Sequence, residues 1–213
     1  MSIGAIARTA AAKPWIWSYV AAAVVWLATI AFTGGQGGGG VLTAALTFGT
    51  FFALVAMGQM FVITLGPGNV DLSIPATMTL AGTVAMKAMD GAEALIPVGL
   101  ALALLTGLAV GVLNFGLILL LRIPPIIATL SSSFVIQSAA IWWNRGLRIK
   151  PPTVLGDFAT TNVAGVPVLA VLVILLAAAM HVVLARTLFG RSVTAIGQNQ
   201  RAARLAGVPV ERV

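Results

Sequence analysis

Long stretches without any charge are the feature that most limits what this sequence can fold into. No charged residue occurs between Lys13 and Asp71, or between Glu93 and Arg122. A helix needs about 20 apolar residues to cross a bilayer core. Only 8% of the 213 residues are charged and 60% are hydrophobic, with a mean hydropathy of +1.07, whereas soluble domains carry roughly 25% charged residues. The composition predicts an integral membrane protein.

The scarcity of reactive side chains excludes several classes of function. The sequence has no cysteine, which rules out a disulfide framework, a thiolate metal site and a cysteine nucleophile. One His and five acids are too few for the usual zinc, iron or calcium clusters, so we expect no metal, no cofactor and no catalytic residue. The net charge of +7 is spread between apolar stretches, which argues against nucleic acid as a partner.

Six apolar segments predict an all-α fold, a polytopic transmembrane helical bundle. The predicted spans are 15–32, 41–65, 72–89, 95–121, 125–142 and 166–184. They give a transmembrane domain from 15 to 184, a short N-terminal region at 1–14 and a polar segment at 185–213. The third span follows a break in the apolar pattern and could instead be re-entrant.

The first span and the orientation of the chain follow from the flanking charges. Basic residues before Trp15–Phe32 suggest a signal peptide, but this apolar run exceeds the roughly 7–15 residues of a signal and no clear Ala-x-Ala site follows it. We therefore expect a retained span. Basic flanks favour the cytoplasmic side, and both termini are predicted there together with Arg8, Lys13, Arg122 and the arginines from Arg186 onward. Lys87 and the basic residues between 145 and 150 oppose this orientation.

The stretch GPGNVDLSIP, at 66–75, interrupts the apolar pattern. Gly-Pro-Gly at 66–68 prevents a continuous helix. Asp71 can cap the next helix by accepting a bond from a backbone N–H two or three residues on, and Pro75 suits its first turn because the missing N–H costs little there. Two interpretations are open. The stretch is a tight turn with a helix cap, or a broken helix whose lone carboxylate touches a transport route.

Neutral polar side chains recur within the apolar spans. Thr129, Ser133 and Gln137 are spaced by four residues and share one helix face. Asn114 and Gln59 supply amides from two other spans. These groups either join membrane helices by hydrogen bonds or line a path for a polar, uncharged solute. The lack of a buried cation or acid cluster in the sequence argues against a proton or ion relay.

The chain closes with a polar and basic segment, GQNQRAARLAGVPVERV. Asn199 can cap a short helix over 202–205 that stops at Gly207, and Pro209 prevents its continuation. Such a helix lies on anionic lipid or docks on another protein, which the small alanines would approach closely.

Three segments resemble, in order and spacing, the ABC-type sugar import permeases of the ribose, xylose and galactose group. They are GNVDLSIPATMTLAGTVAM, IPPIIATLSSSFVIQSAAIWWNRG and GRSVTAIGQNQRAARLAGVPVERV. The resemblance extends from about Val41 to Val213. In that family the cytoplasmic loop docks on a separate ATPase. The resemblance implies an ATPase-coupling role for Gly190, Arg191, Gly197, Asn199, Ala202, Ala203, Arg204, Leu205 and Gly207.

The DLS segment of the family matches Asp71, Leu72 and Ser73. Together with the neutral polar residues they form the candidate translocation path, which is Gln59, Asp71, Leu72, Ser73, Asn114, Thr129, Ser133 and Gln137. The sequence also departs from the family. Gln200 and Arg201 stand where acidic residues are usual, and the family continues with further spans past the point where this sequence stops. We therefore expect an N-terminal portion or a shortened permease.

The resemblance implies a membrane-spanning permease subunit of an ATP-driven importer in the bacterial inner membrane, which carries a sugar or similar polar solute and is not an enzyme. The implied partners are an ABC ATPase subunit, an extracytoplasmic solute-binding protein, a second permease chain and the lipid bilayer. A branched-chain amino acid permease, a secondary transporter that uses the broken helix, and a truncated, non-transporting membrane fragment are the alternatives.

Overall fold

The computed structural model describes residues 13–35, 38–66, 68–145 and 150–213. Arg8, most of the predicted N-terminal region 1–14, Pro67, and the basic residue at 148 lie outside the described residues. The described part is almost entirely helical, with one small pair of strands. The predicted all-α architecture is confirmed.

Five helices in the described ranges are long and apolar enough to cross a membrane. They are α2 (Pro14–Phe32), α3 (Gly38–Thr64), α5 (Ile96–Leu121) with the 3-10 turn η1 (Glu93–Leu95) before it, α6 (Pro125–Trp143) and α8 (Val168–Arg186). The third predicted segment corresponds to α4 (Ile74–Met89), whose 16 residues extend roughly 24 Å. A bilayer core is about 30 Å thick, so α4 needs the non-helical residues before it to complete a crossing. The count of six spans stays a prediction.

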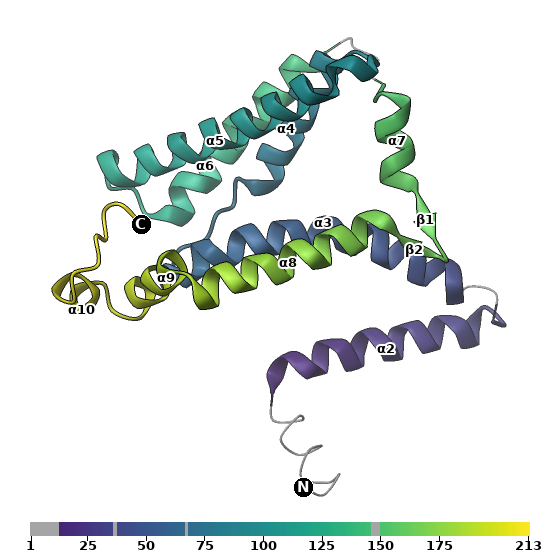
Figure 1. Cartoon of the computed structure of the whole chain (residues 1–213), viewed down its shortest axis with the longest axis horizontal. Helices are drawn as coiled ribbons and strands as arrows, with labels where there is room; N and C mark the ends of the chain where they lie inside the picture. The colour runs from purple at the N-terminus through teal and green to yellow at the C-terminus, as the bar shows by residue number, and fades with distance from the viewer. Residues whose placement is uncertain (1–12, 36–37, 67, 146–149) are drawn as a thin grey trace, which may run out of the picture.

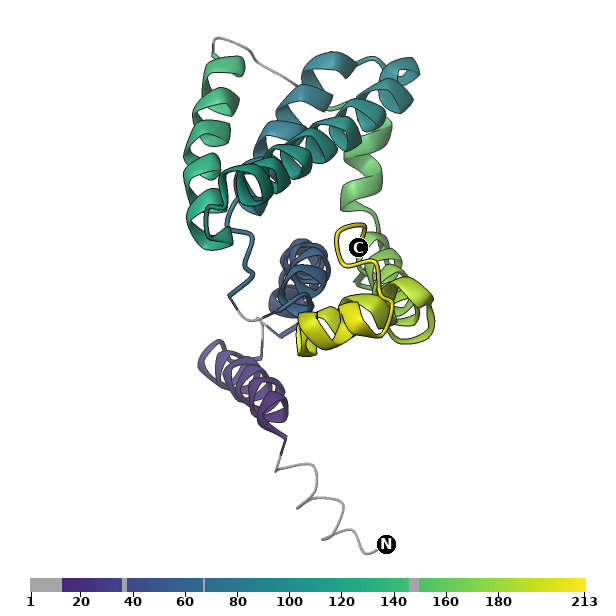
Figure 2. The ribbon, with the colours of Figure 1, turned by 90° about the vertical axis from the view of Figure 1, so that its left-hand side faces the viewer.

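The helices form two groups. One group contains α4, α5 and α6, and the other contains α3, α8 and α9 (Leu188–Gln198), with α9 at one end of the α3–α8 pair (Figure 1). Figure 2 shows α3 and α8 nearly end-on below the first group. The chain passes from α3 to α4 through the break at 65–73, which therefore connects the two groups.

Small residues allow α4 and α5 to approach closely. A methyl group added to Gly99 on α5 would overlap the side chain of Met89 and lie 3.0 Å from the carbonyl oxygen of Ala85 on α4. Met89 is among the most buried side chains of the described part. At the same end, Lys87 Nζ lies 4.1 Å from the ring centroid of Trp143 on α6, a cation–π geometry. Close packing through small residues is how membrane helices associate.

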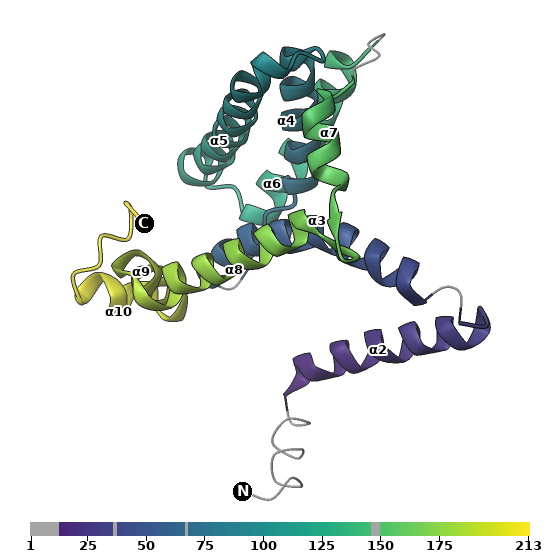
Figure 3. The same cartoon turned by 45° about the vertical axis from the view of Figure 1, so that its right-hand side comes forward.

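The segment between α6 and α8 contains further structure. It holds α7 (Thr153–Thr160) and the antiparallel strands β1 (Asn162–Val163) and β2 (Val166–Pro167), which link the two helix groups on one side of the molecule (Figure 3). Thr153 Oγ1 donates to Glu93 Oε1 at 2.8 Å, and Thr43 Oγ1 donates to the carbonyl oxygen of Gly165 at 3.1 Å. The segment is thus attached to both groups.

Helix α2 is the most loosely attached of the long helices. Trp26 Nε1 donates to the carbonyl oxygen of Gly38 at 3.0 Å, at the start of α3. No residue of α2 is buried within the chain. An apolar helix with no buried face is expected of a span surrounded by lipid.

Replacing Gly99 by Val is expected to lower the free energy of unfolding by about 1–3 kcal/mol, because the larger side chain overpacks the α4–α5 contact. Gly116→Val on the same helix is the matched control, since a side chain at Gly116 meets no other atom within 4 Å. Denaturant titration of both variants in detergent micelles measures the difference. Equal losses for the two variants would contradict the importance of this contact.

Candidate functional site

The helix break sits between the end of α3 at Thr64 and the start of α4 at Ile74. Gly66 and Gly68 have φ values of +146° and +85°, which residues other than glycine rarely adopt. The break predicted from Gly-Pro-Gly is confirmed. Because the residues from 69 to 73 leave the helical ladder, their backbone polar groups need other partners.

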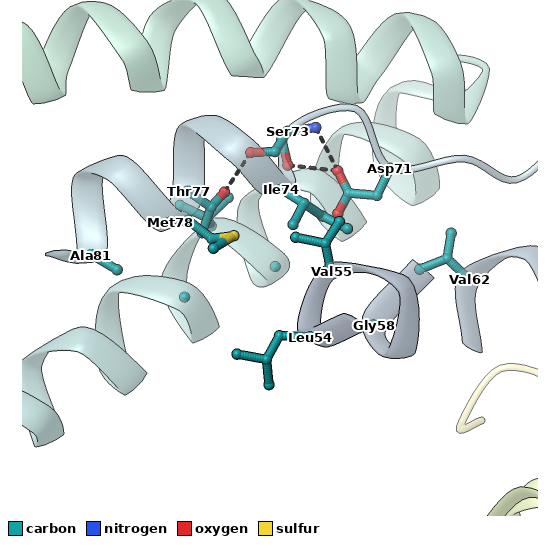
Figure 4. A pocket seen from close by; sticks show the side chains of 13 residues that line it. Leu54, Val55, Gly58, Val62, Asp71, Ser73, Ile74, Thr77, Met78 and Ala81 are labelled. Atoms are coloured by element: carbon teal, nitrogen blue, oxygen red, sulfur yellow. Dashed lines mark hydrogen bonds between the residues drawn. The ribbon is translucent and has the colours of Figure 1, made fainter. Parts of the chain in front are cut away.

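Asp71 is held inside this break by its own chain. Its Oδ1 accepts the N–H of Ser73 at 2.8 Å and the hydroxyl of Ser73 at 2.6 Å (Figure 4). The predicted bond to an N–H two residues on is present, but the predicted cap is wrong, because that N–H belongs to Ser73, which is itself the N-cap residue of α4. The N–H of Asp71 donates to Gln59 Oε1 on α3 at 3.3 Å. Pro75 lies in the first turn of α4, as expected.

Two further helices hold the segment 70–73. Asn114 Nδ2 on α5 donates to the hydroxyl oxygen of Ser73 at 2.8 Å. Thr129 Oγ1 on α6 accepts the N–H of Leu72 at 3.1 Å and lies 3.2 Å from the carbonyl oxygen of Val70. Side chains from α3, α5 and α6 therefore all bind the same short stretch of non-helical backbone. We call residues 69–73 with these side chains the Asp71 junction.

Two open cavities meet at the Asp71 junction. The first, of about 390 Å³, lies between α3, α4 and α5, and its polar lining comes from Asp71, Ser73 and Thr77 (Figure 4). The second, of about 360 Å³, is lined by Asp71, Asn69, Asn114 and Thr129 among apolar side chains of α3, α5 and α6. Among the described residues, Asp71 is the one charged residue that lines either cavity.

The amide oxygen of Asn114 is a buried acceptor that lacks a hydrogen-bond partner within the described part of the chain. The residue is 5% exposed. A buried polar atom left unpaired costs about 1–3 kcal/mol, and such atoms are rare enough in folded proteins to need an explanation. Asn114 also lines the second cavity, so the unpaired oxygen belongs to a residue in the wall of that cavity.

The structure brings together most of the predicted path residues. Gln59, Asp71, Ser73, Asn114 and Thr129 lie in one network, which Leu72 joins through its main chain. Two others stay outside it. The hydroxyl of Ser133 donates to the carbonyl oxygen of Leu130 in its own helix at 2.7 Å, and Gln137 is exposed. Sequence reasoning missed Thr77, although its position four residues after Ser73 on α4 places it on the same face.

The C-terminal segment forms two helices. The predicted one is α10 (Gln200–Leu205), whose cap Asn199 accepts the N–H of Ala202 at 3.0 Å. It ends before Gly207, which has a φ of +85°, as predicted. Helix α9 was not predicted. Thr187 caps it by accepting the N–H of Gly190 at 3.1 Å.

The predicted coupling residues divide into two sets. Those packed within the chain are Gly190, Gly197 and Ala203. The exposed ones are Arg191, Asn199, Ala202, Arg204, Leu205 and Gly207. Leu205 is 91% exposed, and Arg204 makes only an exposed ion pair with Glu211 at 3.4 Å, which contributes little to stability.

Comparison with known proteins identifies the relatives of this chain. Residues 41–213 match a family model described as "Branched-chain amino acid transport system / permease component". The autoinducer 2 import system permease protein LsrC of Shigella flexneri is 32% identical over 173 residues, which cover 81% of this chain and 50% of the relative. LsrC of Enterobacter sp. (strain 638) is 32% identical over 177 residues, covering 79% of this chain and 51% of that protein.

A third relative is the autoinducer 2 import system permease protein LsrD of Yersinia enterocolitica. It is 30% identical over 167 residues, which cover 75% of this chain and 49% of the relative. The chain thus spans about half the length of the curated relatives it matches. No solved structure matches it.

Replacing Ser73 by Ala is expected to lower the free energy of unfolding by about 1–3 kcal/mol, because it leaves the buried amide of Asn114 without its acceptor. Ser133→Ala is the control, since its hydroxyl bonds only to its own helix, and a change within about 0.5 kcal/mol is expected there. Denaturant titration in detergent measures both. A Ser73 variant as stable as the Ser133 variant would show that the network does not support the fold.

Proposed function

The chain belongs to the family of permease components of branched-chain amino acid transport systems and is a multi-pass protein of the bacterial inner membrane, and on that premise we propose that it forms part of the solute pathway of an ATP-driven importer. The family is one of transport components, and in this proposal the chain hydrolyses nothing itself. A separate ABC ATPase subunit supplies the energy. An extracytoplasmic binding protein delivers the solute, and a second permease chain completes the pathway.

The observation that carries the proposal is the Asp71 junction. A carboxylate, an unpaired amide oxygen and a hydroxyl lie at a helix break between two cavities. Ionisable residues among membrane helices are costly and usually mark a solute or ion route. Broken helices mark binding sites in membrane transporters for the same reason, since irregular backbone is tolerated where it lines a cavity.

The lining of the two cavities favours a neutral solute rich in hydroxyl groups, such as a sugar. Carboxylate and amide oxygens accept hydrogen bonds from hydroxyls, and Asp71 and Asn114 supply both kinds of acceptor. The solute of a branched-chain amino acid permease is a zwitterion, and none of the described residues that line either cavity is basic and able to pair with its carboxylate. That contrast supports a polar, uncharged solute over an amino acid.

The exposed face of α10 supports the proposed docking on an ATPase. Leu205 and Arg204 point away from the chain's own helices, and an apolar side chain surrounded by arginines on a cytoplasmic segment is suited to a protein partner. Arg201 stands where the resembling permeases have an acidic residue. We therefore propose that docking here depends on apolar contact and on acidic groups of the partner.

Asp71→Leu is expected to abolish uptake of the solute, because the variant removes the acceptor that faces both cavities. Labelled ribose and labelled leucine, given to cells that express the complete transporter, are the probes. Asp157→Leu, an exposed position on α7, is the control and is expected to retain uptake. Uptake of leucine in place of ribose would contradict the sugar assignment. Uptake that survives ATP depletion and fails when ion gradients collapse would indicate a secondary transporter.

Leu205→Glu is expected to weaken binding of the ATPase subunit about tenfold or more, because burial of a leucine contributes about 1.5–3 kcal/mol and 1.4 kcal/mol corresponds to tenfold. Titration of the purified ATPase onto vesicles that contain the permease measures the affinity. Gln198→Glu adds the same charge at an exposed position of α9 and serves as the control. Equal affinities for the two variants would place the docking surface elsewhere.

A further inference from the structure

We propose that Gly197 is a positioning residue that seats the C-terminal helices on the carboxyl end of α3, so that movement of α9 is transmitted through the main chain to the Asp71 junction. The inference rests on the proposed function, because it assumes that an ATPase moves α10. It adds the contact through which that movement reaches the solute site.

The backbones of α9 and α3 touch at Gly197. A methyl group added there would overlap the carbonyl oxygen of Thr64 and lie 3.3 Å from the carbonyl carbon of Leu65. No side chain fits between the two helices at this point. Phe61 and Phe189 form a second contact, with ring centroids 6.2 Å apart. Main-chain contact transmits displacement directly, because close-packed atoms leave little room to absorb it.

The point of contact lies where α3 gives way to the break. Thr64 is the last residue of α3, and the left-handed glycines Gly66 and Gly68 follow it. Gln59, near the same end of α3, accepts the N–H of Asp71 at 3.3 Å. A shift of the last turns of α3 would therefore move both the covalent connection to Asp71 and the side chain that holds its main chain.

Helix α9 is built to move as a unit with its neighbours. Its face toward the chain buries Val193 and Ile196. A methyl group on Gly190 would overlap main-chain atoms of Leu184 on α8, so this turn is also closed by backbone contact. Asn199 is the single residue between α9 and α10, and it caps α10. Because this connection is short and capped, a displacement of α10 is expected to move α9 as well.

The 213 residues contain no cysteine, so a single cysteine introduced among them can serve as a reporter. The reporter is Ile118→Cys on α5, which lines the second cavity without belonging to the Asp71 junction, labelled with a membrane-impermeant maleimide in vesicles that hold the assembled transporter. Labelling is compared with and without ATP plus vanadate. We expect a nucleotide-dependent change in the labelling rate, and Gly197→Ala is expected to abolish this change while the ATPase subunit still copurifies.

Two controls separate the contact from a general effect of substitution. Gly49→Ala lies on α3 with no neighbouring atom within 4 Å, and Gln198→Ala is exposed next to Gly197. Both are expected to keep the nucleotide-dependent change. Should Gly197→Ala fail to insert, Phe189→Ala removes the second contact without adding bulk and is expected to reduce the change.

The outcomes distinguish the inference from the proposed function. A nucleotide-dependent change that persists in Gly197→Ala, or in Phe189→Ala where the first variant does not insert, overturns the inference and leaves the importer intact. An otherwise unsubstituted reporter chain that binds no ATPase overturns the proposed function and the inference together. A reporter chain that binds the ATPase but shows no change on adding nucleotide overturns the inference alone.

Discussion

The hydrogen bonds between Asp71 and Ser73 are the constraint on which the rest of the structure depends. Gly68, three residues before Asp71, has a left-handed conformation that does not occur in a regular helix. Without the 2.6 Å and 2.8 Å bonds to Asp71, the extended backbone would leave polar groups unpaired in an apolar surrounding. Gln59, Asn114 and Thr129 then attach this segment to three helices. The junction therefore joins the two helix groups and forms the polar wall of both cavities.

One network serves stability and binding at the same place. The hydroxyl of Ser73 has both a donor and an acceptor role, since it donates to Asp71 and accepts from Asn114. The amide oxygen of Asn114, in contrast, is buried without a partner in the described residues. In a hydrocarbon surrounding, a satisfied network fixes the geometry and an unsatisfied acceptor favours a donor from outside. In this proposal the bonded groups join the helices and the unpaired acceptor binds the solute, so both occur at the same place.

Local signals made much of this predictable. The length of the apolar segments, the Gly-Pro-Gly break, the bond from Asp71 and the cap at Asn199 all depend on residues close in sequence. Helix α7 was not predicted, and its bond to Glu93 joins residues far apart in sequence. Helix α9 was missed although its cap, Thr187, is a local signal, whereas its contact with the end of α3 depends on distant residues. The spacing of four residues predicted that Thr129, Ser133 and Gln137 share one helix face. It could not show which of them contacts the Asp71 junction, and of the three only Thr129 does. The pairing of Asn114 with Ser73 joins residues far apart in sequence, which no local pattern indicates.

The association of this chain with an ATPase subunit is the central claim, and the composition of the complex tests it most directly. The measurement is gentle detergent purification of the chain, tagged at its native locus, followed by mass spectrometry of the proteins that copurify and of the chain itself. The account predicts an ATP-binding subunit in stoichiometric amount. Recovery of the membrane chain with no ATP-binding subunit would contradict it, and α10 would then be a helix that lies on the lipid surface.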